Sequence, residues 1–505
     1  MILPDMYNYL RRHRYKFFAV VFVFLFSWGW IFLNTGPVSL PNPSSGVMLR
    51  HTVATGNNGQ AFIPDAPLLN RQPIEGVLTQ ARSGVAGDIT TLQLASEEEY
   101  LTLKPFRIYV YDLPPRFNRD LAACVQKIDT CFQLDENFYG MGPELIGNKS
   151  TVISYRDTHQ FSLEVILHHK MLQSEYRTLN TDEADLFYIP FYPGIACFCR
   201  SYQKGSFDLK SLHQDLWRNI TSTSPYFEVG KPHVMALGKI EREQWSDRCG
   251  ILREYNYANR IQFIGIEEEY KKAYRSYFNR SEQQLLVAPY PSYGHFLETG
   301  RELAEQPNFS NLPSATERKV FAFMAASSSK NHEVRAILKA WLYKTDQDYE
   351  TYLKSNPTED RYEGVWYVTP ECDHSTKLPT IQWMQHSVFC LQPPGDSPTR
   401  KSFYDAAVTG CIPVTFLPEH LLVKYPFQRF LNYSEFTVNF GLETFLAENE
   451  DIVELLKEIP EDEIERLREN LAKISPFLQY SYPSTVKSHD AFHMILKELG
   501  AIFKL

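Results

Sequence analysis

Two cations and a carboxylate lie close together between residues 386 and 416. Arg400 and Lys401 follow a loop rich in Pro, Gly and Ser, and Asp405 comes four residues after Lys401. Arg and Lys side chains are common partners of phosphate groups, and a carboxylate can accept hydrogen bonds from ribose hydroxyls. These residue types at this spacing predict a site for an anion such as a nucleoside diphosphate.

The local pattern predicts the elements that would position these side chains. The apolar run 388–391 indicates a buried strand, which the following Pro-Pro-Gly sequence ends. Ser397 is a favourable helix N-cap and Pro398 suits the first helical position, so we expect a helix that reaches Thr409. Residues 412–416 then form a second strand. The N–H groups at the start of such a helix attract anions.

A purely structural interpretation of this stretch stays open. A buried α/β unit needs only the two apolar strands and the helix between them. Arg400 and Lys401 would then be ordinary solvated cations. The residue pattern alone does not decide between the two interpretations.

Length and charge limit the possible classes of protein. The chain has 505 residues, enough for two or three domains with large cores. Its formal net charge of -9 is mild for this length, and no strongly basic segment suggests a nucleic-acid partner. There is no CxxC pair and no HExxH motif, so a zinc site is not expected.

The sequence contains eight cysteines, which an oxidising compartment would pair. Cys124 and Cys131 are close enough in sequence to close a small loop. Cys390 and Cys411 fall on or beside predicted buried strands, so we expect them to be inert core thiols. The remaining connectivity is not readable from the sequence.

The N-terminal segment predicts a membrane anchor. Residues 17–33 are uncharged and apolar, and as a helix they would span about 25 Å. Basic residues precede this run and the next one is Arg50, so the positive-inside rule makes 1–16 a cytosolic tail and places the rest in the lumen. Residues 34–104, rich in Pro, Gly, Ser, Asn and Thr, predict a flexible stem. A cleaved signal peptide is the alternative.

Five glycosylation triplets agree with a lumenal chain. Each follows the Asn-x-Ser/Thr pattern, although single triplets also arise by chance. The acceptor residues are Asn148, Asn219, Asn279, Asn308 and Asn432.

The remainder of the chain alternates between short apolar runs and amphipathic segments, which is typical of α/β domains. We expect a first domain over 105–300, a second over 301–480 and a docking helix over 481–505. The expected strands are 107–112, 185–190, 233–237, 261–264, 285–288 and 320–324, and the expected helices include 160–176, 212–220 and 333–343.

The stretch FCLQPPGDSPTRKSFYDAAVTGCIPV resembles the donor-site signature of the exostosin-like glycosyltransferases (glycosyltransferase family 47). It is closest to the plant subgroup that contains xyloglucan galactosyltransferases. Other segments resemble the same family in consistent order between about residues 107 and 499: IYVYDLPPRFN, THQFSLEVILHHKM, ADLFYIPFYPG, VAPYPSYGH and HDAFHMIL. The resemblance implies an inverting GT-B enzyme, with two Rossmann-like domains facing a cleft, that uses a nucleotide sugar without an essential metal or other cofactor.

The resemblance also carries site residues over to this chain. It implies that Asp405 holds the ribose and that Arg335 is a second cation for the diphosphate. Lys401 could contact the C6 carboxylate of a uronic acid donor, and Ser402 stands where the wider family has an arginine. Ala325 replaces a common glycine. The residues that would line the diphosphate and the sugar are Gly395, Asp396, Ser397, Thr399 and Arg400.

An inverting transfer needs a base for the acceptor hydroxyl. Glu164 and Asp112 are the leading candidates, although a structural role is open for both. Alternative bases are His159, His168, His169 and His295. The Asp-Gln-Asp sequence 346–348 superficially resembles a metal-binding motif, but it trails a predicted helix, so we expect no metal role.

These observations together predict a single-pass Golgi enzyme that transfers galactose from UDP-galactose to a cell-wall polysaccharide such as xyloglucan. A pentose or uronic acid donor, with a different wall polymer, is the second interpretation. A non-catalytic carbohydrate-binding scaffold subunit is the third. A complex with other Golgi glycosyltransferases is an open possibility for all three.

Overall fold

The computed structural model describes most of the chain from residue 105 to its end. The described residues are 105–129, 131–134, 139–145, 153–202, 207–244, 246, 249–268, 285–297, 313–327, 332–357, 360–369, 375, 377–419, 423–482 and 489–505. All of them belong to one compact unit, Gln72–Leu505. The predicted tail, membrane helix and stem lie outside these residues. Within the described part, no helix is both long and apolar enough to cross a membrane.

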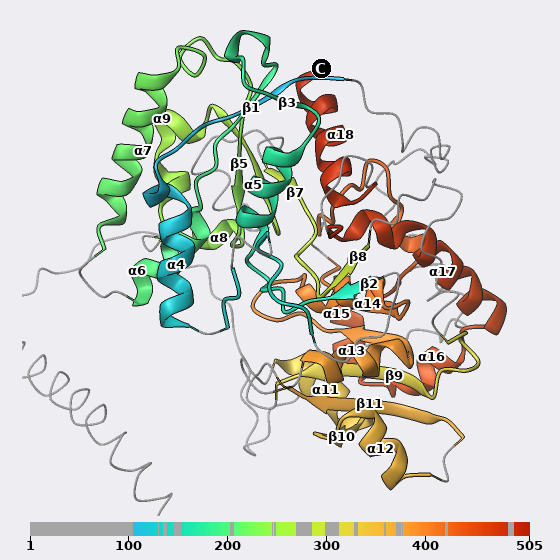
Figure 1. Cartoon of the computed structure of the whole chain (residues 1–505). Helices are drawn as coiled ribbons and strands as arrows, with labels where there is room; N and C mark the ends of the chain where they lie inside the picture. Colours follow the sequence, from blue (N-terminus) through green and yellow to red (C-terminus); the bar gives the residue numbers. More distant parts are fainter. Residues whose placement is uncertain are drawn as a thin grey trace, which may run out of the picture. The chain divides into compact units, whose positions relative to one another are not determined.

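The first half of the described chain forms a six-stranded parallel sheet (Figure 1). All residues of four neighbouring strands are buried, as expected for a parallel sheet that helices cover on both faces. The strand order is β3-β1-β4-β5-β6-β7. The strands are β1 (Ile108–Val110), β3 (Arg177–Thr178), β4 (Leu186–Tyr188), β5 (His233–Leu237), β6 (Ile261–Gly265) and β7 (Leu285–Val287).

Helices cover both faces of this sheet. One core packs α5 (Leu163–Gln173) against the sheet, and the other packs α4 (Arg119–Ile128), α6 (Pro193–Tyr202) and α7 (Leu209–Thr223). The helix predicted over 160–176 is therefore confirmed with shorter bounds. The short helices α8 (Glu241–Gln244) and α9 (Tyr255–Ala258) follow β5, and the 3₁₀ helices here are η1 (Pro115–Phe117), η3 (Thr181–Glu183) and η4 (Ile251–Arg253).

The second half forms another six-stranded parallel sheet, in the order β10-β11-β9-β12-β13-β14. Two Rossmann-like halves, as predicted, are therefore present. Here β9 extends to Ala326, so Ala325 lies inside a strand rather than in a loop. The strands are β9 (Val320–Ala326), β10 (Tyr343–Thr345), β11 (Tyr362–Val368), β12 (Ser387–Gln392), β13 (Ile412–Leu417) and β14 (Val438–Gly441).

The helices of the second half divide between the two faces of its sheet. One core contains residues of α11 (Glu333–Trp341), α15 (Leu442–Glu448), α16 (Ile452–Lys457) and α17 (Glu461–Ile474). The opposite core contains residues of α12 (Tyr349–Ser355) and α13 (Lys377–Gln385). The 3₁₀ helices η8 (Tyr433–Glu435) and η9 (Ser475–Leu478) complete this half.

The helix predicted to begin at Pro398 begins later, since α14 spans Lys401–Val408. Ser397 lies four positions before this helix and does not cap it, and its hydroxyl donates to Glu267. Arg400 is extended, with φ -160° and ψ 153°, and precedes the first helical residue. The helix end near Thr409 and Gly410 is confirmed, with Gly410 at φ +67°.

The prediction that the Asp-Gln-Asp sequence 346–348 trails a helix is wrong. It follows the edge strand β10, and the side chain of Asp348 accepts a hydrogen bond from the Thr351 N–H as the N-cap of α12. Asp348 thus has a structural role here.

The C-terminal helix α18 (Ala491–Phe503) packs on the first half, beside α5 (Figure 1). A fully buried ion pair joins them, with 2.7 Å between Lys170 Nζ and Asp490 Oδ2. Asp490 also caps α18 by accepting the N–H groups of Phe492 and His493. The strands β2 (Ile153–Tyr155) and β8 (Gly294–Phe296) form a two-stranded antiparallel sheet. This sheet contacts the segment that follows η9, because the Phe296 N–H donates to the side chain of Gln479.

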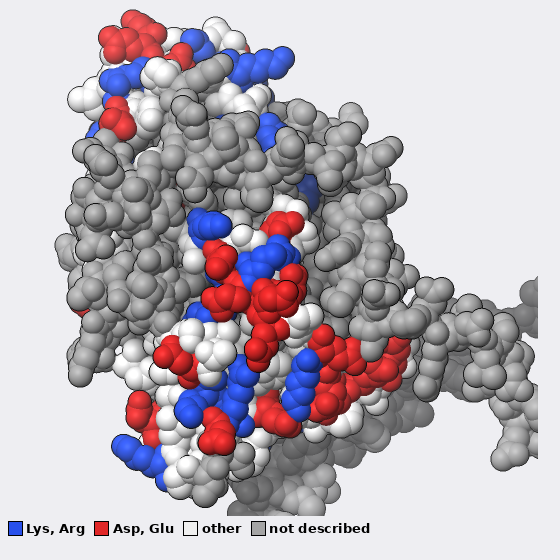
Figure 2. Space-filling view, turned by 90° about the vertical axis from the view of Figure 1, so that its right-hand side faces the viewer, with Lys and Arg blue, Asp and Glu red and all other residues white. Residues whose placement is uncertain are grey.

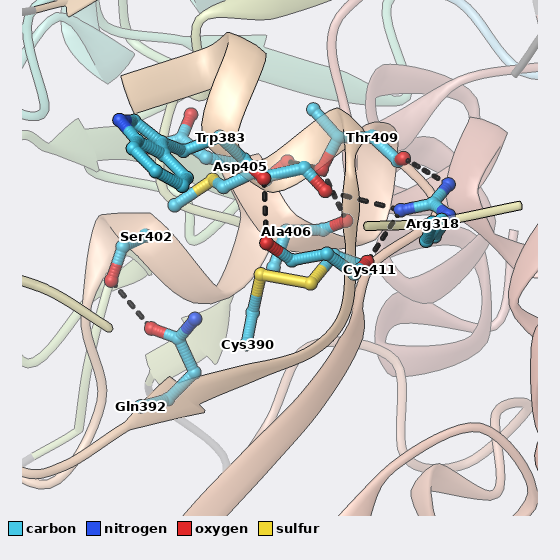
Figure 3. Close-up of a disulfide and its surroundings, with 11 residues drawn as sticks. Arg318, Trp383, Cys390, Gln392, Ser402, Asp405, Ala406, Thr409 and Cys411 are labelled. Atoms are coloured by element: carbon cyan, nitrogen blue, oxygen red, sulfur yellow. Dashed lines mark hydrogen bonds between the residues drawn. A yellow bond between two sulfur atoms is a disulfide. The ribbon is translucent and has the colours of Figure 1, made fainter. Parts of the chain in front are cut away.

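The disulfides correct two predictions. Cys124 pairs with Cys199, because α4 packs against α6, and not with Cys131. Cys390 and Cys411 are not free thiols but form a disulfide that joins β12 to the residue before β13 (Figure 3). This disulfide encloses the whole signature loop and helix α14. A further bond links Cys197 to Cys249, and Cys131 is also disulfide-bonded.

Beside this disulfide lies Arg318, whose side chain is almost fully buried (Figure 3). Its guanidinium donates to the carbonyls of Met384, Ser387 and Thr409 at 3.1, 2.7 and 3.0 Å, and also to Pro313. Two of these carbonyls lie at the C-terminal ends of α13 and α14, where helix dipoles favour a cation. Arg318 therefore fixes the ends of both helices.

Arg318→Met is expected to lower the free energy of unfolding by about 3 kcal/mol or more, because it leaves buried carbonyls without donors. Chemical denaturation would measure the change. The matched control is Arg361→Met, which removes an exposed guanidinium with one carbonyl bond and should cost less than about 1 kcal/mol. Equal losses in the two variants would contradict this role.

Acidic and basic side chains alternate over the described part of the face in Figure 2, with no broad basic patch. Of the predicted glycosylation acceptors, Asn432 is exposed and Asn219 is half-buried in α7. Asn148, Asn279 and Asn308 lie outside the described residues.

Candidate active site

The candidate site lies where the order of the second sheet reverses. From β9 the chain passes to β10 and β11 on one side and then to β12 on the other. Ligands of open α/β sheets bind at the carboxyl ends of the strands at such a switch point. Arg400 spans this point, since its guanidinium donates to the Ala325 carbonyl of β9 at 3.1 Å and to the Pro393 carbonyl after β12 at 3.2 Å.

Arg335, from the first turn of α11, lies beside Arg400. Its Nε donates to the Pro394 carbonyl at 3.1 Å. A Cβ on Gly395 would lie 2.9 Å from Arg335 Nη2, so a larger residue there would require the guanidinium to shift. Burial and, to a smaller extent, the charge of Arg335 lower the pKa of Arg400 to about 9. Burial also lowers the pKa of Arg335.

Two buried cations side by side favour an anionic ligand. Within the described part of the chain, no carboxylate forms a hydrogen bond with either guanidinium. The start of α14 adds to this, because no side chain caps it and the N–H groups of its first two residues precede the intrahelical hydrogen bonds. The arrangement can therefore bind a diphosphate.

Lys401 is used within the protein. Its ammonium lies 2.9 Å from both carboxylate oxygens of Asp405 and 2.9 Å from the ring centre of Tyr293. Burial lowers the pKa of Lys401 to about 8, and burial raises the pKa of Asp405. Asp405 also accepts the backbone N–H of Tyr293 at 2.7 Å. The structure thus shows Asp405 as the partner of Lys401 and of the loop before β8.

The hydroxyls of Ser397 and Thr399 both donate to one carboxylate, that of Glu267. Glu267 follows β6 in the first half, and the hydroxyl of Tyr290 also donates to it, at 3.1 Å. Sequence reasoning missed Glu267. The signal for it was an acidic residue directly after the buried run 261–264, at the carboxyl end of a parallel strand.

Two other predicted site residues have smaller roles in this structure. Asp396 is exposed, and its carbonyl accepts a hydrogen bond from Arg242 of α8 at 3.2 Å. The Ser402 hydroxyl donates to Gln392 at the end of β12 (Figure 3). Both contacts hold the signature loop rather than point to a ligand.

Glu164 lies in the first turn of α5 and is fully buried. Its Oε1 accepts the N–H groups of Gly194 and Gly238, each at 2.7 Å, and its Oε2 accepts that of Ile195 at 3.2 Å. The carboxyl therefore joins the first turn of α6 to the loop after β5. Burial raises its pKa to about 8, against the opposite effect of the three N–H groups.

Asp112 is exposed after β1. Three strand spacings separate β1 from β6, where Glu267 meets the signature loop, which corresponds to roughly 14 Å. Glu164 reaches the end of β5, one strand from β6. The structure thus brings Glu164 closer to the signature loop than Asp112.

The histidines are weaker candidates for a base. Burial lowers the pKa of His159, His168 and His295 to about 3, and lowers that of His169. A base with so low a pKa accepts a proton poorly at neutral pH. His295 is also held between Thr158 and the Tyr480 carbonyl.

Among the described residues, no group of three or more His, Cys, Asp or Glu side chains is suited to hold a metal ion.

Sequence comparison finds relatives among plant wall-polysaccharide enzymes. The chain is 28% identical to the probable xyloglucan galactosyltransferase GT15 of Arabidopsis thaliana, over 77% of this chain and 81% of that protein. It is 29% identical to the xyloglucan-specific galacturonosyltransferase 1 of the same plant, over 78% of this chain. It matches xyloglucan galactosyltransferase MUR3 at 28% identity over 74% of this chain. The matches span only 56% of the galacturonosyltransferase and 58% of MUR3.

Solved structures are more distant. A glycosyltransferase from Rickettsia africae is 10% identical over 80% of this chain and 98% of its own, with a TM-score of 0.31, too low to support an argument. The family is shown by sequence instead. The Exostosin GT47 domain matches residues 102–457, well over half of the chain, and the protein therefore belongs to the exostosin GT47 family of glycosyltransferases.

Proposed function

We propose that the protein transfers galactose from UDP-galactose to a xyloglucan-type cell-wall polysaccharide, with inversion at the sugar. The observation that carries the proposal is the pair Arg335 and Arg400 at the switch point of the second sheet, beside the uncapped start of α14. Such groups stabilise the charge that develops on a departing diphosphate. The names of the relatives support the wall polysaccharide as acceptor.

In this mechanism the chain binds UDP through its second half and the acceptor through its first half. Arg335 and Arg400 hold the diphosphate, and a carboxylate takes the proton of the attacking hydroxyl. We propose Glu164 for this role, because its pKa is near neutral and it lies nearer the signature loop than Asp112 does. Its carboxyl is buried, so the acceptor must gain access to it, and the turnover of the Glu164→Gln variant tests this step.

The donor sugar is the part of the proposal with a specific rival, a uronic acid. One relative is a galacturonosyltransferase, which favours that rival. A uronic acid needs a cation near its C6 carboxylate, and Lys401 is bound to both oxygens of Asp405. This engagement of Lys401 supports the neutral hexose. A pentose donor and the scaffold interpretation make separate predictions in the same assay.

The experiment measures UDP release by the full-length protein with a panel of nucleotide sugars, with and without xyloglucan oligosaccharides. Acceptor-dependent release with UDP-galactose alone is the expected result. Release with UDP-galacturonic acid alone would replace galactose by the uronic acid. UDP binding without release from any donor and acceptor pair would favour a scaffold subunit.

We further expect this activity to be independent of divalent metal, since two guanidiniums can neutralise the diphosphate that a metal neutralises in other transferases. Turnover in EDTA should stay within about twofold of that in Mn²⁺ or Mg²⁺. A loss of turnover in EDTA that Mn²⁺ restores would contradict the metal-free mechanism.

A further inference from the structure

One carboxylate of the first half accepts hydrogen bonds from two hydroxyls of the signature loop of the second half. Glu267 follows β6 and is 4% exposed. Its Oε2 accepts the hydroxyl of Ser397 at 2.9 Å and that of Thr399, and Tyr290 of its own half donates to the same oxygen at 3.1 Å. The residue therefore joins the two halves at the signature loop.

Each hydroxyl has a single proton to donate. Because Ser397 and Thr399 donate theirs to Glu267, these protons are not available to a phosphate oxygen in this arrangement. The groups left for a diphosphate are the two guanidiniums and the first N–H groups of α14. Ser397 and Thr399 thus act as anchors of the loop rather than as phosphate ligands.

A second contact holds the same loop against the first half. Arg242 of α8 donates to the Asp396 carbonyl at 3.2 Å, and the N–H of Glu241 donates to the backbone carbonyl of Glu267 at 3.3 Å. The loop between β12 and α14 is therefore fixed on both sides of Pro398. Arg400 follows directly and bonds back to Pro393.

We propose that Glu267 is a positioning residue for donor binding, which fixes the loop 393–399 through Ser397 and Thr399 so that Arg335 and Arg400 converge on the diphosphate. This rests on the proposed function, because it assigns Glu267 a role at the same nucleotide-sugar site. Glu267 acts through the loop and does not itself take the acceptor proton. Its loss therefore weakens the binding of the donor more than it slows turnover of the bound complex.

The test compares Glu267→Gln with Glu268→Gln in the full-length protein. Glu268 is the adjacent buried carboxylate and pairs with Lys424 at 2.8 Å, which makes it a matched control. We expect Glu267→Gln to raise the Kd of UDP and the donor KM about tenfold, with kcat within about threefold and an unchanged pH profile. Glu268→Gln should leave all four quantities unchanged.

Thr399→Val gives an independent test, because it keeps Glu267 and removes one of its donors. It should raise the donor KM in the same direction, and the double variant Glu267→Gln/Thr399→Val should be no weaker than Glu267→Gln alone. Thermal unfolding of each variant shows whether the fold is intact. Additive effects of the two substitutions would overturn the proposal.

Other outcomes of Glu267→Gln also overturn it. A fall in kcat of about 1,000-fold at constant KM, with loss of the acid limb of the pH profile, would make Glu267 a base. Tighter UDP binding would mean that Glu267 competes with the diphosphate for the two hydroxyls. Failure of the unsubstituted protein to bind UDP would instead refute the proposed function, so the two failures are distinguishable.

Discussion

Replacing Arg400 with alanine is expected to weaken UDP binding about 100-fold. A charge-assisted hydrogen bond to a phosphate contributes about 1.5–3 kcal/mol, and each 1.4 kcal/mol is a tenfold change in affinity. The change also removes the bonds that join β9 to the loop after β12. Calorimetric titration with UDP measures the loss directly.

Arg400→Lys separates charge from geometry. Lysine keeps the positive charge but lacks the planar fork that bonds two groups at once, so we expect a loss of about tenfold. Arg361→Ala, an exposed arginine of the same half, should leave UDP affinity unchanged. Unaltered UDP affinity in Arg400→Ala would remove the switch-point cations from the donor site.

The elements around Arg400 were predictable because they depend on local sequence. The apolar run before Pro393 is a strand, and Gly410 ends α14 at positive φ, as the turn chemistry required. The buried strands β4, β5, β6, β9, β12 and β13 were predicted for the same reason, since a parallel sheet covered on both faces needs continuous apolar runs, whereas β11 was not predicted. The order of alternating elements then determined the fold class.

The start of α14 could not be predicted in the same way. Ser397 and Pro398 are residue types that favour a helix start, yet α14 begins only at Lys401. The Ser397 hydroxyl donates to Glu267, a carboxylate 130 positions earlier in the chain. The disulfide of Cys390 with Cys411 was missed because two buried strand cysteines look like core thiols until the strands are known to pair. Such contacts follow from the tertiary arrangement and leave no local pattern.

The contacts of the site residues likewise depend on the tertiary arrangement. Arg335 lies in the first turn of α11 and Arg400 directly before α14, and both donate to carbonyls of the loop after β12. Asp405, which the resemblance assigns to the ribose, binds Lys401 and a backbone N–H of the first half in this structure. Asp405 gains the Tyr293 N–H as a partner because α14 packs against the loop before β8.

The second large effect is expected for Glu164→Gln, which should lower kcat by 100-fold or more while UDP binding stays unchanged. The amide can still accept the N–H groups of Gly194 and Gly238 but cannot accept that of Ile195 with its nitrogen. The lost bond should cost about 1–3 kcal/mol of stability, so unfolding must be measured beside turnover. Asp112→Asn should keep turnover, because Asp112 lies three strands from the end of β6.

The raised pKa of Glu164 gives the experiment a second readout. The folded protein holds this proton up to a pKa of about 8, whereas the carboxyl in the unfolded chain loses it near 4.5. Its contribution to stability is therefore complete below about pH 4.5 and is lost as the pH rises to about 8. Turnover that needs the ionised carboxylate changes in the opposite direction and rises with pH up to about 8. Glu164→Gln should remove both dependences. A variant that flattens the stability profile but keeps the pH profile of kcat would make Glu164 a structural residue that holds the first turn of α6 and the loop after β5.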